Sequence, residues 1–77
     1  MSEVINMLKE MCAKKLKSAR ELGNQNEAIK FITIGEILEN NESVKLEPDV
    51  WLNILSDLGF SNFEAVKIYT QILKSEH

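Results

Sequence analysis

The alternation of hydrophobic and polar positions along the chain predicts four helices. In each of them, apolar residues recur at the three- and four-residue spacings of one helix face. A polar, turn-rich segment at residues 39–43 separates the second helix from the third. The predicted fold class is therefore all-α: a small four-helix domain, residues 1–77, built from two antiparallel helical hairpins. The predicted helices cover residues 3–22, 25–39, 48–58 and 62–75.

Short local motifs mark the two hairpin turns. Gly23 stands where the first helix must end, at a position that favours a left-handed backbone, and Asn24 follows as the N-cap of the next helix. Gly59 ends the third helix in the same way. Ser61 and Glu64 then form the sequence pattern of a capping box. Each hairpin is thus predicted to turn within a few residues.

The most apolar run of the chain lies at residues 28–38 and predicts a central helix that contacts the other three. Ile29 falls outside its main stripe, so this helix must be covered on more than one side, within a bundle or in a dimer. Gly35 in mid-helix indicates close approach of another helix. Core packing is the main interpretation, and a ligand groove is the alternative. The shared core is predicted to contain Phe31, Ile34, Leu38, Leu55, Leu58, Val66 and Tyr69.

Composition indicates a small folded protein inside the cell. The chain has 77 residues, of which 44% are hydrophobic and 27% charged, as in globular rather than disordered chains. Cys12 is the only cysteine and has no internal disulfide partner. The sequence shows no signal peptide and no long apolar span. We therefore expect a cytoplasmic location and no membrane association.

Charge is distributed unevenly, and the predicted interaction surface follows from it. Residues 1–20 hold five basic and two acidic residues, for a net charge of +3, whereas residues 21–77 hold four lysines and ten acidic residues, for −6. A basic first helix on an acidic body could contact that body, a protein partner or nucleic acid. The candidate interaction surface consists of Met7, Met11, Lys14, Lys15, Lys17 and Arg20.

The residues that carry catalysis in other proteins are sparse here. The single histidine, His77, is the last residue, and Cys12 lies on the apolar face of a helix, where a structural thiol is expected. No metal-ligand spacing, calcium loop or glycine-rich phosphate loop is present. We therefore expect no enzyme activity, no catalytic or metal-binding residues and no cofactor.

Two partial resemblances concern the second half of the chain. The turn at residues 55–60, Leu-Ser-Asp-Leu-Gly-Phe, followed by Ser61, Glu64, Ala65 and Lys67, resembles the first two helices of a ubiquitin-associated domain. We do not extend this resemblance to ubiquitin binding. Residues 44–73, taken as strand, helix, glycine turn and helix, are similar to ribbon-helix-helix repressors and antitoxins. That similarity implies a DNA-binding dimer whose strand exposes Ser43, Lys45 and Glu47.

The preferred interpretation is a small non-catalytic intracellular protein-binding or regulatory module that acts through a helical surface. The alternative is a DNA-binding regulator of the ribbon-helix-helix or antitoxin type that uses residues 44–73 or the basic first helix. Self-association as a two-fold homodimer is a further expectation. It rests on the short chain and on the wide apolar face of residues 3–22, which includes Val4, Met11 and Leu22. If the third and fourth helices cover that face, no dimer is needed.

Overall fold

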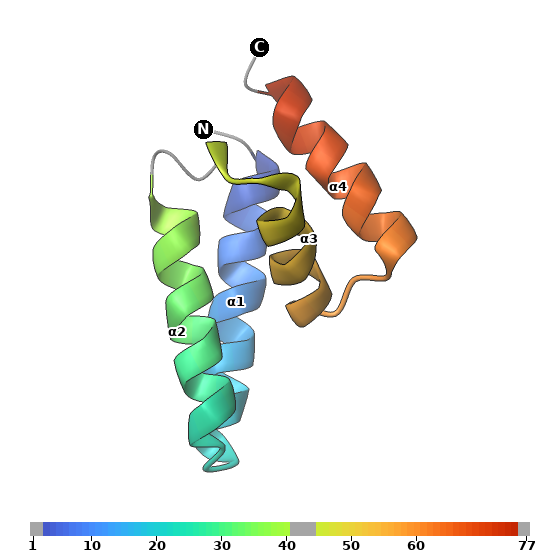
Figure 1. Cartoon of the computed structure of the whole chain (residues 1–77). Coiled ribbons are helices and arrows are strands. Elements are labelled where there is room, and N and C mark those ends of the chain that lie inside the picture. Colours follow the sequence, from blue (N-terminus) through green and yellow to red (C-terminus); the bar gives the residue numbers. More distant parts are fainter. Residues whose placement is uncertain (1–2, 41–44, 76–77) are drawn as a thin grey trace.

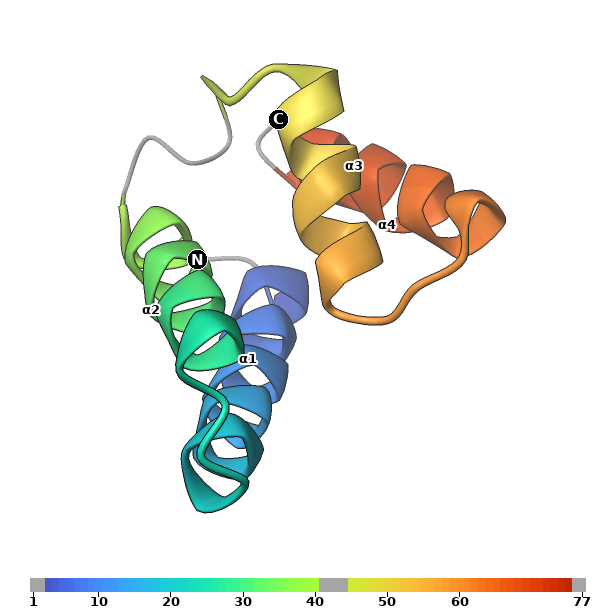
Figure 2. The same ribbon diagram turned by 60° about the horizontal axis from the view of Figure 1, so that its bottom comes forward.

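The computed structural model describes residues 3–40 and 45–75, and this part of the chain forms four helices and no strand. Their bounds are α1 Glu3–Glu21, α2 Gln25–Glu39, α3 Pro48–Asp57 and α4 Asn62–Ser75. α1 and α2 run antiparallel, and α3 and α4 form a second antiparallel pair (Figure 1). Figure 2 shows these hairpins as two distinct pairs. The predicted fold class is confirmed, and the helix ends agree with the prediction to within one residue.

Both hairpins turn through a glycine in the left-handed region, as predicted. The φ angle is 72° at Gly23 and 105° at Gly59. In the second turn the N–H of Phe60 donates to the carbonyl of Leu55 at 3.1 Å, the long hydrogen bond of a Schellman motif. The first turn makes the equivalent hydrogen bond. Each glycine therefore ends one helix and aims the chain back along it.

Side-chain caps begin α2 and α4, as the sequence predicts. The side-chain oxygen of Asn24 accepts a hydrogen bond from the N–H of Glu27 at 3.1 Å. Ser61 and Glu64 form a complete capping box: the Ser61 hydroxyl accepts from the Glu64 N–H at 3.2 Å, and the Ser61 N–H donates to the Glu64 carboxylate at 3.2 Å. In each hairpin turn, hydrogen bonds therefore stabilise both the end of the first helix and the start of the second.

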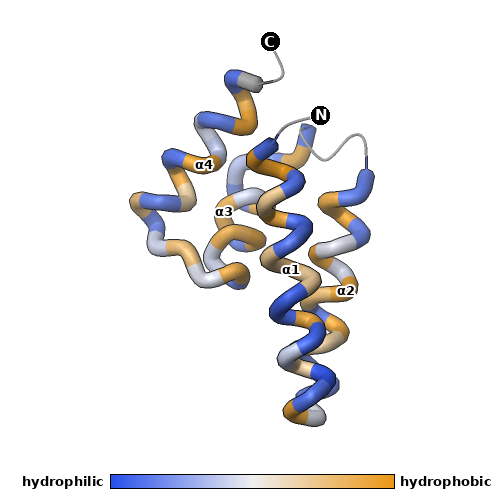
Figure 3. The backbone as a smooth tube through the Cα atoms, turned by 180° about the vertical axis from the view of Figure 1, so that it is seen from behind, coloured by the Kyte–Doolittle hydropathy of each residue, from blue (hydrophilic) through white to orange (hydrophobic). Residues whose placement is uncertain are grey.

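One apolar cluster joins the four helices. Apolar and polar positions alternate along each helix (Figure 3), so each helix has an apolar side to turn inward. The indole of Trp51 is completely buried, and its Nε1 finds no acceptor among the described residues. The cluster contains Ile5, Leu8, Cys12, Phe31, Ile34, Leu38, Trp51, Ile54, Leu55, Leu58, Ala65 and Ile72.

The core prediction is confirmed for the residues of α2 and α3 and is wrong for Val66. Tyr69 packs partly buried against the cluster. Val66 is 52% exposed, because α4 turns Ala65 and Ile72 inward instead. Adjacent helical residues differ by about 100° in direction, so burying Ala65 places Val66 outside. Hydrophobicity favoured the larger valine, whereas the packing places the smaller alanine against the other helices.

The prediction of α2 as the central helix is also wrong. α1 packs against both α2 and α4, whereas the packing of α2 is concentrated on α1. α1 can link the hairpins because its apolar arc is wide: Val4, Met11 and Leu16 all pack against the core cluster. α3 and α4 therefore cover part of the face that suggested a two-fold dimer.

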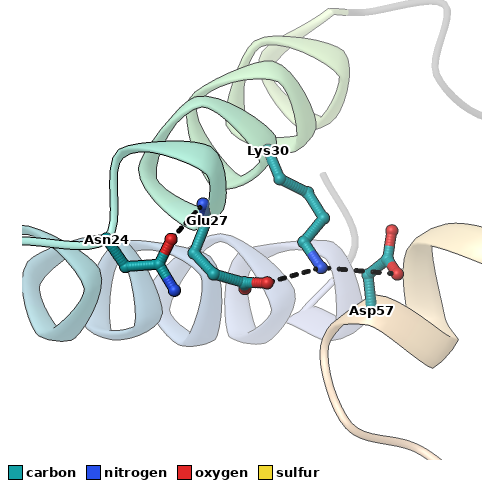
Figure 4. Close-up of polar contacts among 4 residues, drawn as sticks. All are labelled: Asn24, Glu27, Lys30 and Asp57. Atoms are coloured by element: carbon teal, nitrogen blue, oxygen red, sulfur yellow. Dashed lines mark hydrogen bonds and ion pairs between the residues drawn. The ribbon is translucent and has the colours of Figure 1, made fainter.

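One contact between α2 and α3 is polar and lies at the edge of the core. The ammonium of Lys30 lies 3.9 Å from Asp57 on α3 and 3.1 Å from Glu27 on its own helix (Figure 4). All three side chains are well exposed. Exposed ion pairs of this kind contribute little to stability, so the buried Phe31, Ile34 and Leu38 hold α2 in place through the apolar cluster.

Candidate protein-interaction site

The predicted interaction surface on the first helix does not form a single surface. Lys14, Lys17 and Arg20 are exposed on α1. The exposed acids Glu10 and Glu21 lie on the same helix, so its outer side carries both signs of charge. A helix face of mixed charge is typical of a solvated surface rather than of a continuous basic patch.

The remaining predicted residues point to other places. Met11 packs against the core, whereas Met7 is 43% exposed. Lys15 extends toward the second hairpin, where its ammonium lies 3.9 Å from the position that a Cβ on Gly59 would occupy. It lines a hollow of about 280 Å³ between the hairpins, together with Glu27 and Asp57. Lys15, a member of the predicted interaction surface, therefore lies in a charged hollow between the two hairpins.

A larger concave feature lies between α1 and α2, and we call it the α1–α2 groove. Its volume is about 470 Å³, and among the described residues neither α3 nor α4 contributes to its walls. It is an open groove on the first hairpin, and Cys12 and Phe31 on its floor also belong to the apolar core. It is lined by Lys9, Cys12, Ala13, Leu16, Phe31, Ile32, Gly35, Glu36 and Glu39.

Small side chains create this groove. A Cβ at Gly35 would meet the Cys12 sulfur at 3.7 Å, which is ordinary van der Waals contact. The predicted approach of another helix to Gly35 is thus confirmed, although it is not close enough to require glycine. Ala13, which lines the α1 wall of the groove, is also a small residue. Because these residues are small, the two helices leave an open space beside their contact, and side chains of another molecule can enter it.

The groove has an apolar floor and charged residues toward one end. Lys9 of α1 lies 3.7 Å from Glu39 of α2, and the pair spans the groove where α1 begins and α2 ends. Glu36 lies one turn nearer the middle and is exposed. At the opposite end the walls are Leu16 and Ile32. The α2 wall therefore combines apolar contact area with two carboxylates.

Cys12 forms part of the groove floor and has the properties of a structural thiol. It is 3% exposed, and its sulfur donates a hydrogen bond to the Phe31 carbonyl at 3.0 Å. Burial raises the pKa of the Cys12 thiol, and a hydrogen bond from the Gly35 backbone offsets only part of that effect. The thiol is therefore neutral near pH 7, whereas a nucleophilic cysteine requires a lowered pKa.

The geometry gives no specific support to the DNA-binding alternative. Lys45 and Glu47 lie in the turn and N-cap before α3, where the resemblance to ribbon-helix-helix proteins implies a strand, and Ser43 lies outside the described residues. Within residues 3–40 and 45–75, no group of acidic, histidine or cysteine side chains is arranged to hold a metal ion. None of the described helices combines the length and apolar character needed to cross a membrane.

The fold and groove define a four-helix domain of two hairpins with an open apolar groove on the first. Comparison of the chain with protein-family models, with curated proteins and with solved structures gives no match.

Sequence reasoning found some of the groove residues and missed others. Gly35 was singled out by its position in mid-helix, and a groove was the alternative interpretation of residues 28–38. The sequence reasoning does not single out Ala13, because alanine on a helix carries no distinctive signal, and it includes Ile32 only as part of the apolar run at residues 28–38. Small residues on facing sides of the first two predicted helices are the signal that would have found this site.

Proposed function

We propose that this protein is a non-catalytic binding module that receives an apolar helix of a protein partner in the α1–α2 groove. The observation that carries the proposal is the groove itself: its floor is apolar, its charged residues lie on the walls, and the second hairpin leaves it uncovered. Binding of an amphipathic helix in a hydrophobic groove is a common mode of peptide recognition. The module acts in the cytoplasm, in keeping with its single reduced cysteine.

Three features support binding over catalysis. The one thiol is buried and neutral, so it supplies no nucleophile. The groove walls hold one lysine and two carboxylates, of which Lys9 and Glu39 already pair with each other. The remaining lining is apolar or small, which suits contact area rather than proton transfer.

The test is selection of helical peptides on the immobilised full chain, followed by mapping of the selected peptides by nitrogen–proton correlation spectra. We expect peptides with an apolar stripe, and shifts centred on Ala13, Ile32 and Gly35. Ala13→Glu, which places a charged side chain on the groove wall, should abolish binding. Asn53→Glu, an equal charge change at an exposed site on α3, should leave it intact.

Two results would contradict the proposal. One is that shifts gather on α3 and α4 while the groove signals stay in place. The other is that Ala13→Glu binds the selected peptides as tightly as the wild type. A parallel filter-binding measurement with DNA addresses the alternative: DNA binding that weakens steeply with salt would favour the regulator hypothesis instead.

A further inference from the structure

The outer side of α4 carries a second apolar feature that no part of the described fold covers. We call it the α4 ridge. Its spacing of three, four and three residues keeps its members on one side of the helix, away from the buried Ala65 and Ile72. Phe63 is 71% exposed and Val66 52%. The ridge consists of Phe63, Val66, Thr70 and Leu73.

Two lysines follow one flank of this ridge. Lys67 and Lys74 are one heptad apart, so they lie on the same side of α4, and both are exposed. The Lys67 ammonium lies 4.6 Å from the centre of the Phe63 ring, a cation–π contact that holds the charge beside the apolar surface. Within residues 62–74, the opposite flank carries Asn62 and Tyr69 and no carboxylate.

The ridge and the α1–α2 groove correspond in length and in charge. The groove is lined from residue 9 to residue 16 of α1, and the first three ridge positions extend over the same seven-residue distance, roughly 10 Å in a helix. The ridge projects apolar side chains with lysines beside them. The groove offers an apolar floor with the carboxylate of Glu36 on the α2 wall, next to the Lys9–Glu39 ion pair.

We propose, resting on the groove as the binding site, that its occupant is the α4 ridge of a second copy of this chain. Docking places the aromatic and aliphatic ridge residues over the groove floor and brings Lys67 toward Glu36. The contact is heterologous, since the two surfaces belong to different hairpins. Heterologous contacts produce rings when their rotation closes and open chains when it does not.

Charge disfavours the simpler contact of ridge against ridge. An antiparallel two-fold arrangement brings the same flank of both helices together, so the two copies of Lys67 would face each other. A parallel arrangement would set the lysines against the flank that holds Asn62 and Tyr69. Neither gives a lysine an opposite charge, whereas the groove does. The head-to-tail contact thus differs from the two-fold dimer expected from the first helix, which would use another surface.

The experiment is sedimentation equilibrium of the full chain over a wide concentration range. The average mass should rise above the 8.8 kDa of one chain as concentration increases. Val66→Glu on the ridge and Ala13→Glu in the groove should each weaken association by roughly tenfold or more. Asn53→Glu is the matched control and should associate like the wild type. Circular dichroism verifies that each variant is folded.

Mixing the variants decides the geometry. The ridge variant retains a groove and the groove variant retains a ridge, so a mixture of the two should form a two-chain species although each alone stays monomeric. If Val66→Glu unfolds the domain, Lys67→Glu supplies the ridge variant, and pairing it with Glu36→Lys should restore association.

Contrary outcomes separate the two proposals. A mixture that stays monomeric while the wild type associates would replace the head-to-tail contact by a symmetric one. A wild type that remains at 8.8 kDa at every concentration would overturn self-association altogether. In that case, peptide binding that maps to the groove would leave the proposed function standing with a different partner. Loss of peptide binding as well would remove both.

Discussion

The two hairpins have similar topology but fill their interiors with different side chains. The second hairpin contributes Trp51, Leu55, Leu58 and Ile72, all 1% exposed or less. The first hairpin also buries large residues, including Leu8 and Leu38, but beside the groove its helices carry the smaller Cys12, Ala13 and Gly35. Large residues fill the space between helices, whereas small residues leave the α1–α2 groove. Both hairpins therefore contribute to the core, and the first carries in addition the groove that we propose as the binding surface.

Trp51→Ala should produce the largest loss of stability. The indole is completely buried, and truncation of a buried tryptophan to alanine costs about 3–5 kcal/mol. Chemical denaturation followed by circular dichroism measures the change. Trp51→Phe should cost clearly less, because it keeps the ring and removes an Nε1 donor without an acceptor among the described residues. Equal losses for the two variants would show that the indole nitrogen has a partner.

Substitution of glycine by alanine should lower the stability of the protein at Gly59 in the second hairpin and raise it at Gly35 in the first. At Gly59, with a φ of 105°, an added Cβ strains the turn and should cost roughly 1–2 kcal/mol. At Gly35, inside α2, the Cβ makes ordinary contact with Cys12 and raises helix propensity, so a gain of up to about 1 kcal/mol is expected. Thermal melts of the two variants test this. A loss at Gly35 would mean that the helices pack more tightly there than the 3.7 Å approach indicates.

The agreement between sequence and structure follows the range of the interactions. Caps and turns at Gly23, Asn24, Gly59 and Ser61 depend on neighbours within a few residues, so the sequence alone locates every helix. Which faces meet depends on contacts distant in the chain. Val66 and Ala65 are adjacent and both apolar, and only the approach of α4 to α1 and α3 decides which one is buried. For the same reason, the sequence alone does not reveal that α1 links the two hairpins.

The candidate site was predictable to a smaller degree. A groove is a property of two facing surfaces, and the pattern along one helix records only one of them. Gly35 gave a signal because glycine is unusual within a helix, whereas Ala13 on the facing helix gave none. The sequence-based prediction placed the interaction surface on the exposed lysines of α1, because charge is readable from the sequence whereas a groove is not. The proposed pairing of the α4 ridge with the groove rests on two surfaces that only the three-dimensional fold defines.

Ser61→Ala should cost about 1 kcal/mol, because it removes the side-chain half of a capping box. Asn24→Ala removes the single side-chain bond to Glu27 and tests the corresponding position in the first hairpin. The urea denaturation midpoint should fall in both variants, and the Ser61 variant should lose at least as much as the other. If only Asn24→Ala has an effect, the cap of α4 is not needed to hold the second hairpin.

The smallest expected effect is a pH dependence confined to the first hairpin, since the described core residues of α3 and α4 include no ionisable side chain. Burial raises the pKa of the Cys12 thiol in the folded chain. The unfolded chain then loses its thiol proton first, at an ordinary pKa of about 8.5. The resulting contribution to stability is complete below that pH and is lost as pH rises toward the folded pKa.

Comparison of the wild type with Cys12→Ala isolates this contribution, because every other side chain is common to both proteins. The difference in unfolding free energy should be constant from pH 6 to about pH 8 and should then shift against the wild type at higher pH. Curves that remain parallel up to pH 10 would show that the thiol ionises as easily in the folded protein as in the unfolded chain. The groove floor would then be wetter than the 3% exposure of Cys12 indicates.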